Sequence, residues 1–500
     1  MSTITIKHLN FAYDGQTPLF SDANFYLDTN WHLGLVGRNG RGKTTLLRLL
    51  QGQLDYTGEL SVPVALTYFP QPITDPSQLT LYALQETNDF EQWQLERELN
   101  LMGMTPDLLW RPYAELSGGE QTKVRLALLF TDTEHFALID EPTNHLDGAS
   151  RALVADYLKR KSGFIVISHD RHFLDQVTDH TLAIDRQQIT LYQGNYATYA
   201  DAKANQDASE RAEDQKLRRD IQRLEQTAAE KARWSASREK DKYGDRHVKN
   251  SGGIPDKGFI GARAARVMQK HKNLERRMDN EIAAKSELLN NIESVAPLTI
   301  NTLPDHHSVY IHADQLQLGH DGTPLFAPIS FDVLPGERVA LVGPNGIGKS
   351  SVLRALAGHF TGEGTGTLTQ PQLALSWVRQ QIDNRGTLAA FATARHLDYQ
   401  ALLNNLKKLG LERASFTTPI ELMSMGQQKK VELAASLVTP ANLLIWDEPL
   451  NYLDLYNQDQ LADSILQSRP TMLFVEHDAD FIAKVATKVI KLNQSEAERI

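Results

Sequence analysis

One residue type and two sequence patterns are missing from this 500-residue sequence, and each absence excludes a kind of site or a class of protein. There is no cysteine, so disulfide bonds, thiolate nucleophiles and cysteine-ligated zinc are excluded. No run approaches the roughly 18 to 20 consecutive apolar residues that cross a bilayer. The amino terminus also lacks the basic and apolar regions of a signal peptide. We therefore expect a cytoplasmic protein that does not span a membrane and that holds any metal through oxygen or imidazole ligands.

Net charge is unevenly distributed along the chain. The whole sequence has 52 basic and 62 acidic residues, a balance of −10. Residues 231–277 alone carry 14 Lys and Arg against 5 Asp and Glu, a local excess of +9. A basic stretch inside an acidic protein predicts that this one segment contacts a polyanion.

The sequence repeats itself with an offset near 307 residues. The spacing of the repeated motifs drifts by at most three residues, which predicts a duplicated domain of about 200 residues. We expect the copies to occupy residues 1–200 and 301–500. The landmark pairs include Lys43 with Lys349, Gln71 with Gln380, Ser117 with Ser424, Asp140 with Asp447, and His169 with His477.

A helical linker, residues 201–300, is expected between the copies. Residues 203–240 and 262–293 each place apolar side chains at helical spacing, which favours an antiparallel helical hairpin. The expected turn, 241–261, contains five glycines and Pro255 and so cannot be helical throughout. A solvated spacer is the alternative, but a spacer has no use for apolar residues at its tip.

Each copy carries a glycine-rich loop between an apolar strand and a helix. In such a P-loop, backbone N–H groups and the helix N-terminus surround phosphates, the lysine reaches the β- and γ-oxygens, and the Thr or Ser hydroxyl holds Mg²⁺. The sequence therefore predicts two ATP-binding loops. Their residues are Gly37, Asn39, Gly40, Gly42, Lys43, Thr44 and Thr45 in the first copy and Gly343, Asn345, Gly346, Gly348, Lys349, Ser350 and Ser351 in the second.

Two acids follow an apolar run about 97 residues after each P-loop lysine. The first acid, Asp140 or Asp447, can hold Mg²⁺ from the end of a strand beside the P-loop. The second acid, Glu141 or Glu448, can accept a proton from an attacking water. A further phosphate-type site is predicted where Ser117, Gly118 and Gly119 precede a helix.

Taken in order, these motifs resemble the ABC ATPase family, which implies an α/β fold with two P-loop nucleotide-binding domains. The resemblance implies a head-to-tail sandwich in which the P-loop of one copy faces the Ser-Gly-Gly-type signature of the other, with ATP and Mg²⁺ in both sites. Further residues take roles only through this resemblance. They are Tyr13 for adenine stacking, Gln71 and Gln380 as lid residues and Mg²⁺ ligands, His169 and His477 at the γ-phosphate, Asp147 and Asp454 at the seam, and Ser424 and Gly426 in the second signature.

The arrangement of domains resembles the ABC-F group, because two fused nucleotide domains are joined by a linker of about 100 residues. Asp140-Glu-Pro-Thr-Asn-His-Leu-Asp147 also follows the pattern of this group. The short segments between lid and signature are similar to the antibiotic-resistance branch, especially to Lsa-type members, through Asp241-Lys-Tyr-Gly244 and Met423-Ser-Met-Gly-Gln427.

This resemblance implies a monomeric ATPase that binds the 70S ribosome at the exit site, contacts 23S rRNA and P-site tRNA, and has no membrane domain and no DNA partner. ATP would drive binding, and the linker tip would displace lincosamide, pleuromutilin or streptogramin A drugs before hydrolysis releases the protein. The tip residues that we expect near RNA are Lys242, Tyr243, Arg246, Lys249, Ile254, Pro255, Phe259, Arg263 and Arg266.

Three other functions stay open on the sequence: a general translation factor that rescues stalled ribosomes, the ATPase subunit of a drug exporter, and a DNA-repair or chromosome protein. The two ATP sites are also expected to be unequal. Met425 replaces a signature glycine, and a side chain there keeps the backbone from phosphate. The site on Lys43 and Glu141 is therefore expected to be the slower one, while His320 in place of Tyr13 weakens adenine stacking in the other site.

Overall fold

The fold is described from a computed structural model of the chain. The chain divides into two compact units, one of residues 1–199 with 295–500 and one of residues 200–294. The larger unit contains both sequence repeats. The described residues are 2–15, 18–132, 135–144, 146–185, 188–241, 276, 297–380 and 382–494.

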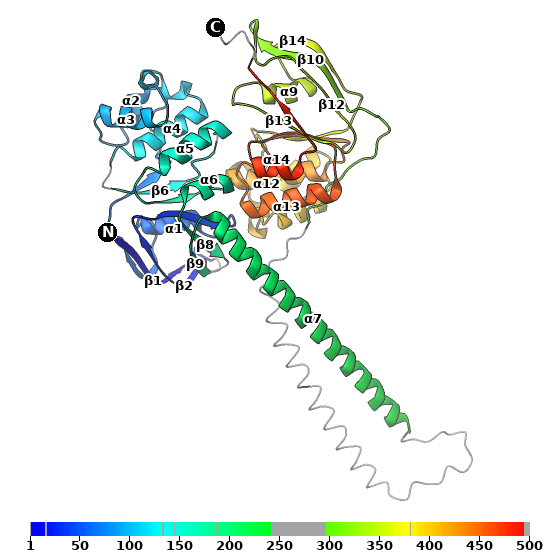
Figure 1. The fold of residues 1–500 in the computed structure, drawn as a ribbon. Coiled ribbons are helices and arrows are strands. Elements are labelled where there is room, and N and C mark those ends of the chain that lie inside the picture. The colour runs from blue at the N-terminus through cyan, green and yellow to red at the C-terminus, as the bar shows by residue number, and fades with distance from the viewer. Residues whose placement is uncertain are drawn as a thin grey trace, which may run out of the picture. The chain divides into compact units, whose positions relative to one another are not determined.

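The first half of the larger unit combines a mainly parallel sheet with a small antiparallel one (Figure 1). The sheets have the orders β5-β6-β7-β3-β8-β9, with β9 antiparallel to β8, and β2-β1-β4. The strands are β1 (Thr3–Phe11), β2 (Phe20–Asp28), β3 (His32–Gly37), β4 (Thr57–Ser61), β5 (Leu66–Phe69), β6 (Phe136–Asp140), β7 (Phe164–Ile167), β8 (His180–Asp185) and β9 (Gln188–Gln193). The helices are α1 (Lys43–Leu50), α2 (Thr80–Gln85), α3 (Gln92–Leu101), η1 (Pro106–Trp110), η2 (Tyr113–Glu115), α4 (Gly118–Leu129), α5 (Gly148–Leu158) and α6 (Arg171–Val177).

The second half repeats this plan. Its parallel sheet has the order β15-β16-β17-β13-β18, and its antiparallel sheet joins β11, β10, β12 and β14. The strands are β10 (Ile311–His320), β11 (Thr323–Pro324), β12 (Ile329–Val333), β13 (Arg338–Val342), β14 (Glu363–Thr369), β15 (Leu375–Val378), β16 (Leu443–Asp447), β17 (Met472–Val475) and β18 (Lys488–Lys491). The helices are α9 (Lys349–Leu356), α10 (Leu388–Ala394), α11 (Tyr399–Lys408), η3 (Arg413–Thr417), η4 (Ile420–Leu422), α12 (Met425–Val438), α13 (Leu455–Ser468) and α14 (Ala479–Val485). The predicted duplication of an α/β domain is confirmed.

Each parallel sheet separates two hydrophobic cores. Successive side chains of a strand point to opposite faces, so in β6 Leu138 packs with the antiparallel sheet and α1, whereas Ile139 packs with the helices of the other face. Ile445 and Trp446 divide in the same way in β16. Strands buried on both faces read as continuous apolar runs, and in β6 and β16 the run stops at the less buried Asp140 or Asp447.

Side-chain caps begin the helices that carry the motifs. Ser117 accepts the backbone N–H of Glu120 and forms a capping box at the start of α4, and Ser424 does the same with Gln427 at α12. Such boxes satisfy N–H groups that have no partner within the helix. The two signature sequences therefore lie at helix N-termini.

The expected first linker helix is confirmed as α7 (Tyr196–Asp241). The expected turn at 241–261 and the second helix at 262–293 lie outside the described residues, with Asp241 and residue 276 the exceptions, so the hairpin stays a prediction. Among the described residues, no helix combines the length and the apolar character needed to cross a membrane.

Candidate functional site

Two glycine-rich loops hold buried lysines at the carboxyl ends of β3 and β13. Gly42 has a φ of 96°, and a Cβ on it would lie 2.7 Å from the Leu19 side chain, so this turn requires glycine. Lys43 Nζ donates to the Gly37 carbonyl oxygen at 2.6 Å. In the second copy, Lys349 Nζ donates to the Gly343 and Pro344 carbonyl oxygens at 2.9 and 2.8 Å.

Both lysines are suited to bind an anion. Lys43 is 7% and Lys349 6% exposed. Burial lowers the pKa of each ammonium group, while nearby carboxylates oppose that shift. A buried cation that is paired mainly with carbonyl dipoles gains most from a negatively charged ligand.

Strand-end acids lie beside these loops. Asp140 Oδ2 accepts hydrogen bonds from the hydroxyls of Thr44 at 3.0 Å and Tyr68 at 2.9 Å. In the second copy, burial raises the pKa of Asp447, and a hydrogen bond from Ser350 opposes the shift. The predicted hydroxyl and acid pairs thus lie together in both copies.

The second acid of each pair sits in a strained backbone conformation. Glu141 and Glu448 have φ values of 53° and 48°, which non-glycine residues seldom adopt. Their backbone N–H groups donate to the carbonyl oxygens of Ile167 and Val475 at 2.9 and 3.0 Å. Strain of this kind is found where the surrounding structure holds a functional side chain in place.

A buried histidine accompanies each of these glutamates. His169 Nε2 lies 3.3 Å from Glu141 Oε1 and 3.1 Å from Asn39 Oδ1. His477 Nε2 lies 3.7 Å from Glu448 Oε1. Burial, followed by the charge of the P-loop lysine, lowers the pKa of His169 to about 3 and of His477 to about 4. Both imidazoles are therefore neutral near pH 7.

Burial also raises the pKa of Glu141 to about 8, and the neighbouring Asp140 charge adds to this shift. Without a ligand, the Glu141 carboxyl therefore keeps its proton at neutral pH. A carboxyl with a pKa this close to neutrality can exchange a proton with a bound water.

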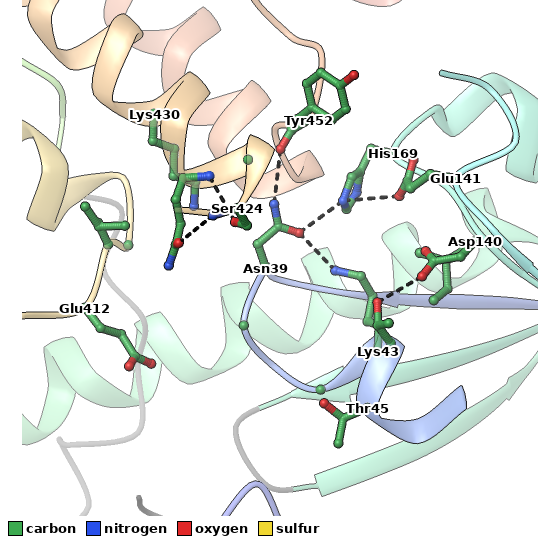
Figure 2. A pocket seen from close by; sticks show the side chains of 18 of the residues that line it. Asn39, Lys43, Thr45, Asp140, Glu141, His169, Glu412, Ser424, Lys430 and Tyr452 are labelled. Atoms are coloured by element: carbon green, nitrogen blue, oxygen red, sulfur yellow. Dashed lines mark hydrogen bonds and ion pairs between the residues drawn. The ribbon is translucent and has the colours of Figure 1, made fainter. Parts of the chain in front are cut away.

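The first of these sites is a cavity of about 640 Å³ that both halves line. Figure 2 shows Asn39 at its centre, between Lys43, His169 and Tyr452. Acidic and basic side chains line the cavity together with the backbone of the glycine-rich loop, as a site for a phosphorylated ligand requires. Its residues from the first half include Tyr13, Gly40, Lys43, Thr45 and Asp140, and those from the second half include Glu412, Ser424, Gly426, Gln427 and Lys430.

Hydrogen bonds join each glycine-rich loop to the opposite half. Asp454 Oδ2 accepts the Asn39 backbone N–H at 2.8 Å. Asp147 Oδ2 accepts the backbone N–H of Asn345 at 3.2 Å. Asn39 Nδ2 also donates to the Tyr452 carbonyl oxygen at 3.2 Å. The structure thus places both predicted seam aspartates against the loop of the other copy.

The two lid glutamines differ in their surroundings. Gln71 is buried, and its amide nitrogen and oxygen both lack a hydrogen-bond partner among the described residues. Gln380 Nε2 instead donates to Glu448 Oε2 at 3.0 Å. Tyr13, which is predicted to stack on adenine, lines the first cavity. Its phenol oxygen lies 3.0 Å from the Thr45 hydroxyl oxygen.

The remaining predicted residues keep their expected places in the chain. Gly346 and Gly348 have φ values of 78° and 98°, and Ser351 lies in the first turn of α9. Gly118 and Gly119 begin α4. In the second signature, Ser424 and Gly426 line the cavity, whereas the Met425 side chain is about half exposed.

The sequence reasoning missed two residues of the first site. Lys430 of α12 donates to the Leu409 carbonyl oxygen at 2.7 Å and lies 3.9 Å from Asp454 Oδ2. Tyr68 bonds Asp140, as described above. The signal for Lys430 was its helical spacing from the apolar Val431, Ala434 and Leu437, whereas Tyr68 looks like any other strand residue.

The predicted RNA-contacting residues, Lys242, Tyr243, Arg246, Lys249, Ile254, Pro255, Phe259, Arg263 and Arg266, lie outside the described residues.

Comparisons with known proteins agree with the duplicated site. Residues 20–144 and 326–451 each match the family model described as ABC transporter. The chain is 28% identical over 520 residues to the ribosome protection protein VmlR of Bacillus subtilis (strain 168), covering 99% of this chain and 88% of that protein. It is 26% identical to the energy-dependent translational throttle protein EttA of Mycobacterium tuberculosis (strain CDC 1551 / Oshkosh), covering 97% and 90%. Among solved structures, a model of ribosome-bound archaeal Pelota and ABCE1 shares the fold, with a TM-score of 0.61, 19% identity, and coverage of 93% and 72%.

Proposed function

This chain belongs to the ABC transporter family of ATPases, within the ABC-F group, and from that premise we propose that it closes two composite sites on ATP in order to act on the ribosome. The observation that carries the proposal is the pair of bonds across the halves, Asp454 to Asn39 and Asp147 to Asn345. Each loop that would hold phosphates is bonded by the other half. Occupancy of the sites and closure of the halves are therefore linked.

The residues of both sites fit ATP and Mg²⁺. Gln71 offers a buried amide without a described partner, and Asp447 Oδ1 is likewise buried and unpaired among the described residues. Buried polar atoms without partners are costly unless a ligand pairs with them. Mg²⁺, when bound, would neutralise charge on the β- and γ-phosphates. Its proposed ligands are Thr44, Gln71 and Asp140 in one site and Ser350, Gln380 and Asp447 in the other.

Hydrolysis then depends on the acid that follows each Mg²⁺ ligand. We assign Glu141 and Glu448, in their ionised forms, as the groups that accept a proton from the attacking water, because each is held by strained backbone beside the P-loop. His169 and His477 are neutral and can donate a hydrogen bond to a γ-phosphate oxygen. Lys43 and Lys349 bind the phosphates from the opposite side, which leaves positioning and charge stabilisation as the work of the protein.

The proposed target is the 70S ribosome, with the exit site, 23S rRNA and P-site tRNA as the contacted parts. The similarity to a ribosome protection protein over 99% of the chain supports this target. The basic excess in residues 231–277 also suits a phosphate backbone. We propose that the linker tip displaces lincosamide, pleuromutilin or streptogramin A drugs, and that hydrolysis releases the protein.

A general translation factor is the second candidate. Similarity to a translational throttle protein over 97% of the chain favours it. Both candidates require ATP-dependent binding to ribosomes, so only the response to a drug separates them.

The first experiment tests ribosome binding with the double variant Glu141→Gln, Glu448→Gln. This variant is expected to bind ATP without hydrolysing it and to sediment with ribosomes only when ATP is present. Glu59→Gln, at a glutamate whose side chain is 79% exposed, serves as the matched control and should behave like the wild type. Failure of the double variant to sediment with ribosomes in ATP would overturn the proposal and return attention to an exporter ATPase.

The second experiment measures translation in extracts that contain lincomycin. Wild-type protein is expected to restore translation, and Tyr243→Ala with Phe259→Ala in the linker tip should abolish this effect without loss of ATP-dependent sedimentation. Sedimentation without any rescue would instead identify a general translation factor.

A further inference from the structure

Helix α12 belongs to both composite sites. Its N-terminus presents Ser424 and Gly426 to the cavity on Lys43. A Cβ on Gly426 would lie 3.7 Å from Asn39 Nδ2, so this end of the helix is packed against the first P-loop. One and a half turns later, the same helix reaches the lid and the strand-end acids of the second site.

The second contact is made by Lys429, which is 1% exposed. Its Nζ donates to the carbonyl oxygens of Arg379 at 3.2 Å and Asp447 at 3.4 Å. Arg379 directly precedes the lid residue Gln380, and Asp447 directly precedes Glu448. A single ammonium group thus ties the signature helix of one site to two catalytic segments of the other.

A buried acid accompanies this lysine. Glu476 is 3% exposed, and its carboxylate accepts the backbone N–H groups of His477 at 2.7 Å and Leu450 at 3.2 Å. Burial raises the pKa of Glu476 to about 7, and among the acids near Lys429 it most opposes the lowering of the Lys429 pKa by burial. The segment before His477 is therefore linked electrostatically to Lys429.

The first copy provides an internal comparison, because neutral residues occupy both positions. Thr122 takes the place of Lys429 in α4, and its hydroxyl donates to the Gly118 carbonyl oxygen of the same helix at 2.9 Å. Ser168 takes the place of Glu476 and bonds Thr143 at 2.9 Å. Ionisable residues at these two positions are therefore not a requirement of the fold.

We propose that Lys429 is a positioning residue that couples the signature of the Lys43 site to the lid and the strand-end acid of the Lys349 site. The inference rests on the proposed assignment of the two composite sites. When α12 moves with closure over the first site, the carbonyl groups before Gln380 and Glu448 move with it, because the buried ammonium has few other partners. In the first copy, Thr122 bonds only its own helix in the described residues, so the signature of the Lys349 site has no such link to the lid and acid of the Lys43 site.

The test measures hydrolysis at the second site alone, in a Glu141→Gln background. Lys429→Met should lower kcat about five- to tenfold while the KM for ATP stays within about twofold, because Lys349 and its loop are unchanged. Ser424→Ala, although it lies in the other site, should also lower kcat. Combined with Lys429→Met, it should lower kcat by less than a further twofold, since the connection is already broken.

The mirror experiment uses a Glu448→Gln background with Thr122→Val and Ser117→Ala. These two changes should act independently on turnover at the first site, and Thr122→Val alone should change it less than twofold. Lys429→Thr provides a second variant, because threonine is accommodated at this position in the first copy.

Independent effects of Lys429→Met and Ser424→Ala would overturn the coupling while leaving the two sites in place. A different failure is also distinguishable: if neither Glu141→Gln nor Glu448→Gln alone lowers turnover, the assignment of the sites is wrong and the coupling falls with it.

Discussion

The two composite sites share their motifs but differ in what surrounds the strand-end acid. In the first site, Asp140 accepts hydrogen bonds from Thr44 and Tyr68. In the second site, Trp377 takes the place of Tyr68. Trp377 pairs with Ile445 of β16, and Tyr68 pairs with Leu138 at the equivalent position of β6. Among the described residues, no hydrogen bond joins the Trp377 indole to Asp447, whose Oδ1 has no partner.

The seam aspartates differ as well. Asp454 is 2% exposed and lies 3.9 Å from the buried Lys430, whereas Asp147 is less buried. Both copies keep the glycine-rich loop, its lysine and hydroxyl, and the pair of strand-end acids. The residues around these groups differ, with Asp454 and Lys430 buried at the first site and Lys429 and Glu476 buried at the second.

The largest predicted effect concerns stability. Asp454→Ala should lower the free energy of unfolding by about 3–5 kcal/mol, because it leaves the Lys430 ammonium buried without its partner. Asp147→Ala is the matched control, since both aspartates also cap a helix, α13 or α5. It should cost about 1 kcal/mol. Urea denaturation of both variants measures the difference, and equal losses would contradict the comparison.

The next effect concerns turnover. Glu448→Gln should lower total ATP hydrolysis more than about tenfold, because loss of a proton acceptor typically costs a factor of about 100 or more at its own site. Glu141→Gln should lower it by only about a tenth or less, since the Met425 signature makes that site the slower one. Phosphate release from ribosome-bound protein is the measurement. Comparable losses in the two variants would show that the sites are equal.

A pH dependence of stability follows from Glu141. Its pKa is raised to about 8 in the folded state, so the folded protein holds a proton that the unfolded chain loses near pH 4.5. The resulting stabilisation is complete below pH 4.5 and is lost as pH rises to about 8. Between pH 6.5 and 8, the ATP-free wild type should therefore lose about 2 kcal/mol more stability than Glu141→Gln. Thermal denaturation across this window tests it, and parallel curves for the two proteins would count against it.

The smallest predicted effect concerns Mg²⁺. In a Glu448→Gln background, Tyr68→Phe should raise the Mg²⁺ concentration for half-maximal hydrolysis about three- to fivefold, because Asp140 loses the hydroxyl that orients it. Trp377→Phe, tested in a Glu141→Gln background, is the control and should change this concentration less than twofold. A larger response to the tryptophan change would reverse the comparison.

Much of the candidate site could be predicted from the sequence because its parts are local. A phosphate-binding loop needs glycines, a lysine and a hydroxyl within eight consecutive residues, and the acid pair needs an apolar strand directly before it. Because the domain is duplicated, each motif occurs twice and the second copy supports the interpretation of the first. Helix α7 could also be predicted, because its apolar residues recur at helical spacing within one continuous stretch.

The sequence by itself determined the two α/β copies, the P-loops, the acids and the helical start of the linker. Only the tertiary structure decided that Asn39 meets Asp454 and that Lys429 meets Arg379 and Asp447. Those contacts join residues that are far apart in the chain, and burial and charge in the folded interior decide which side chains meet. No local sequence pattern predicts them, because a lysine such as Lys429 looks the same in the sequence whether its helix is buried or faces solvent.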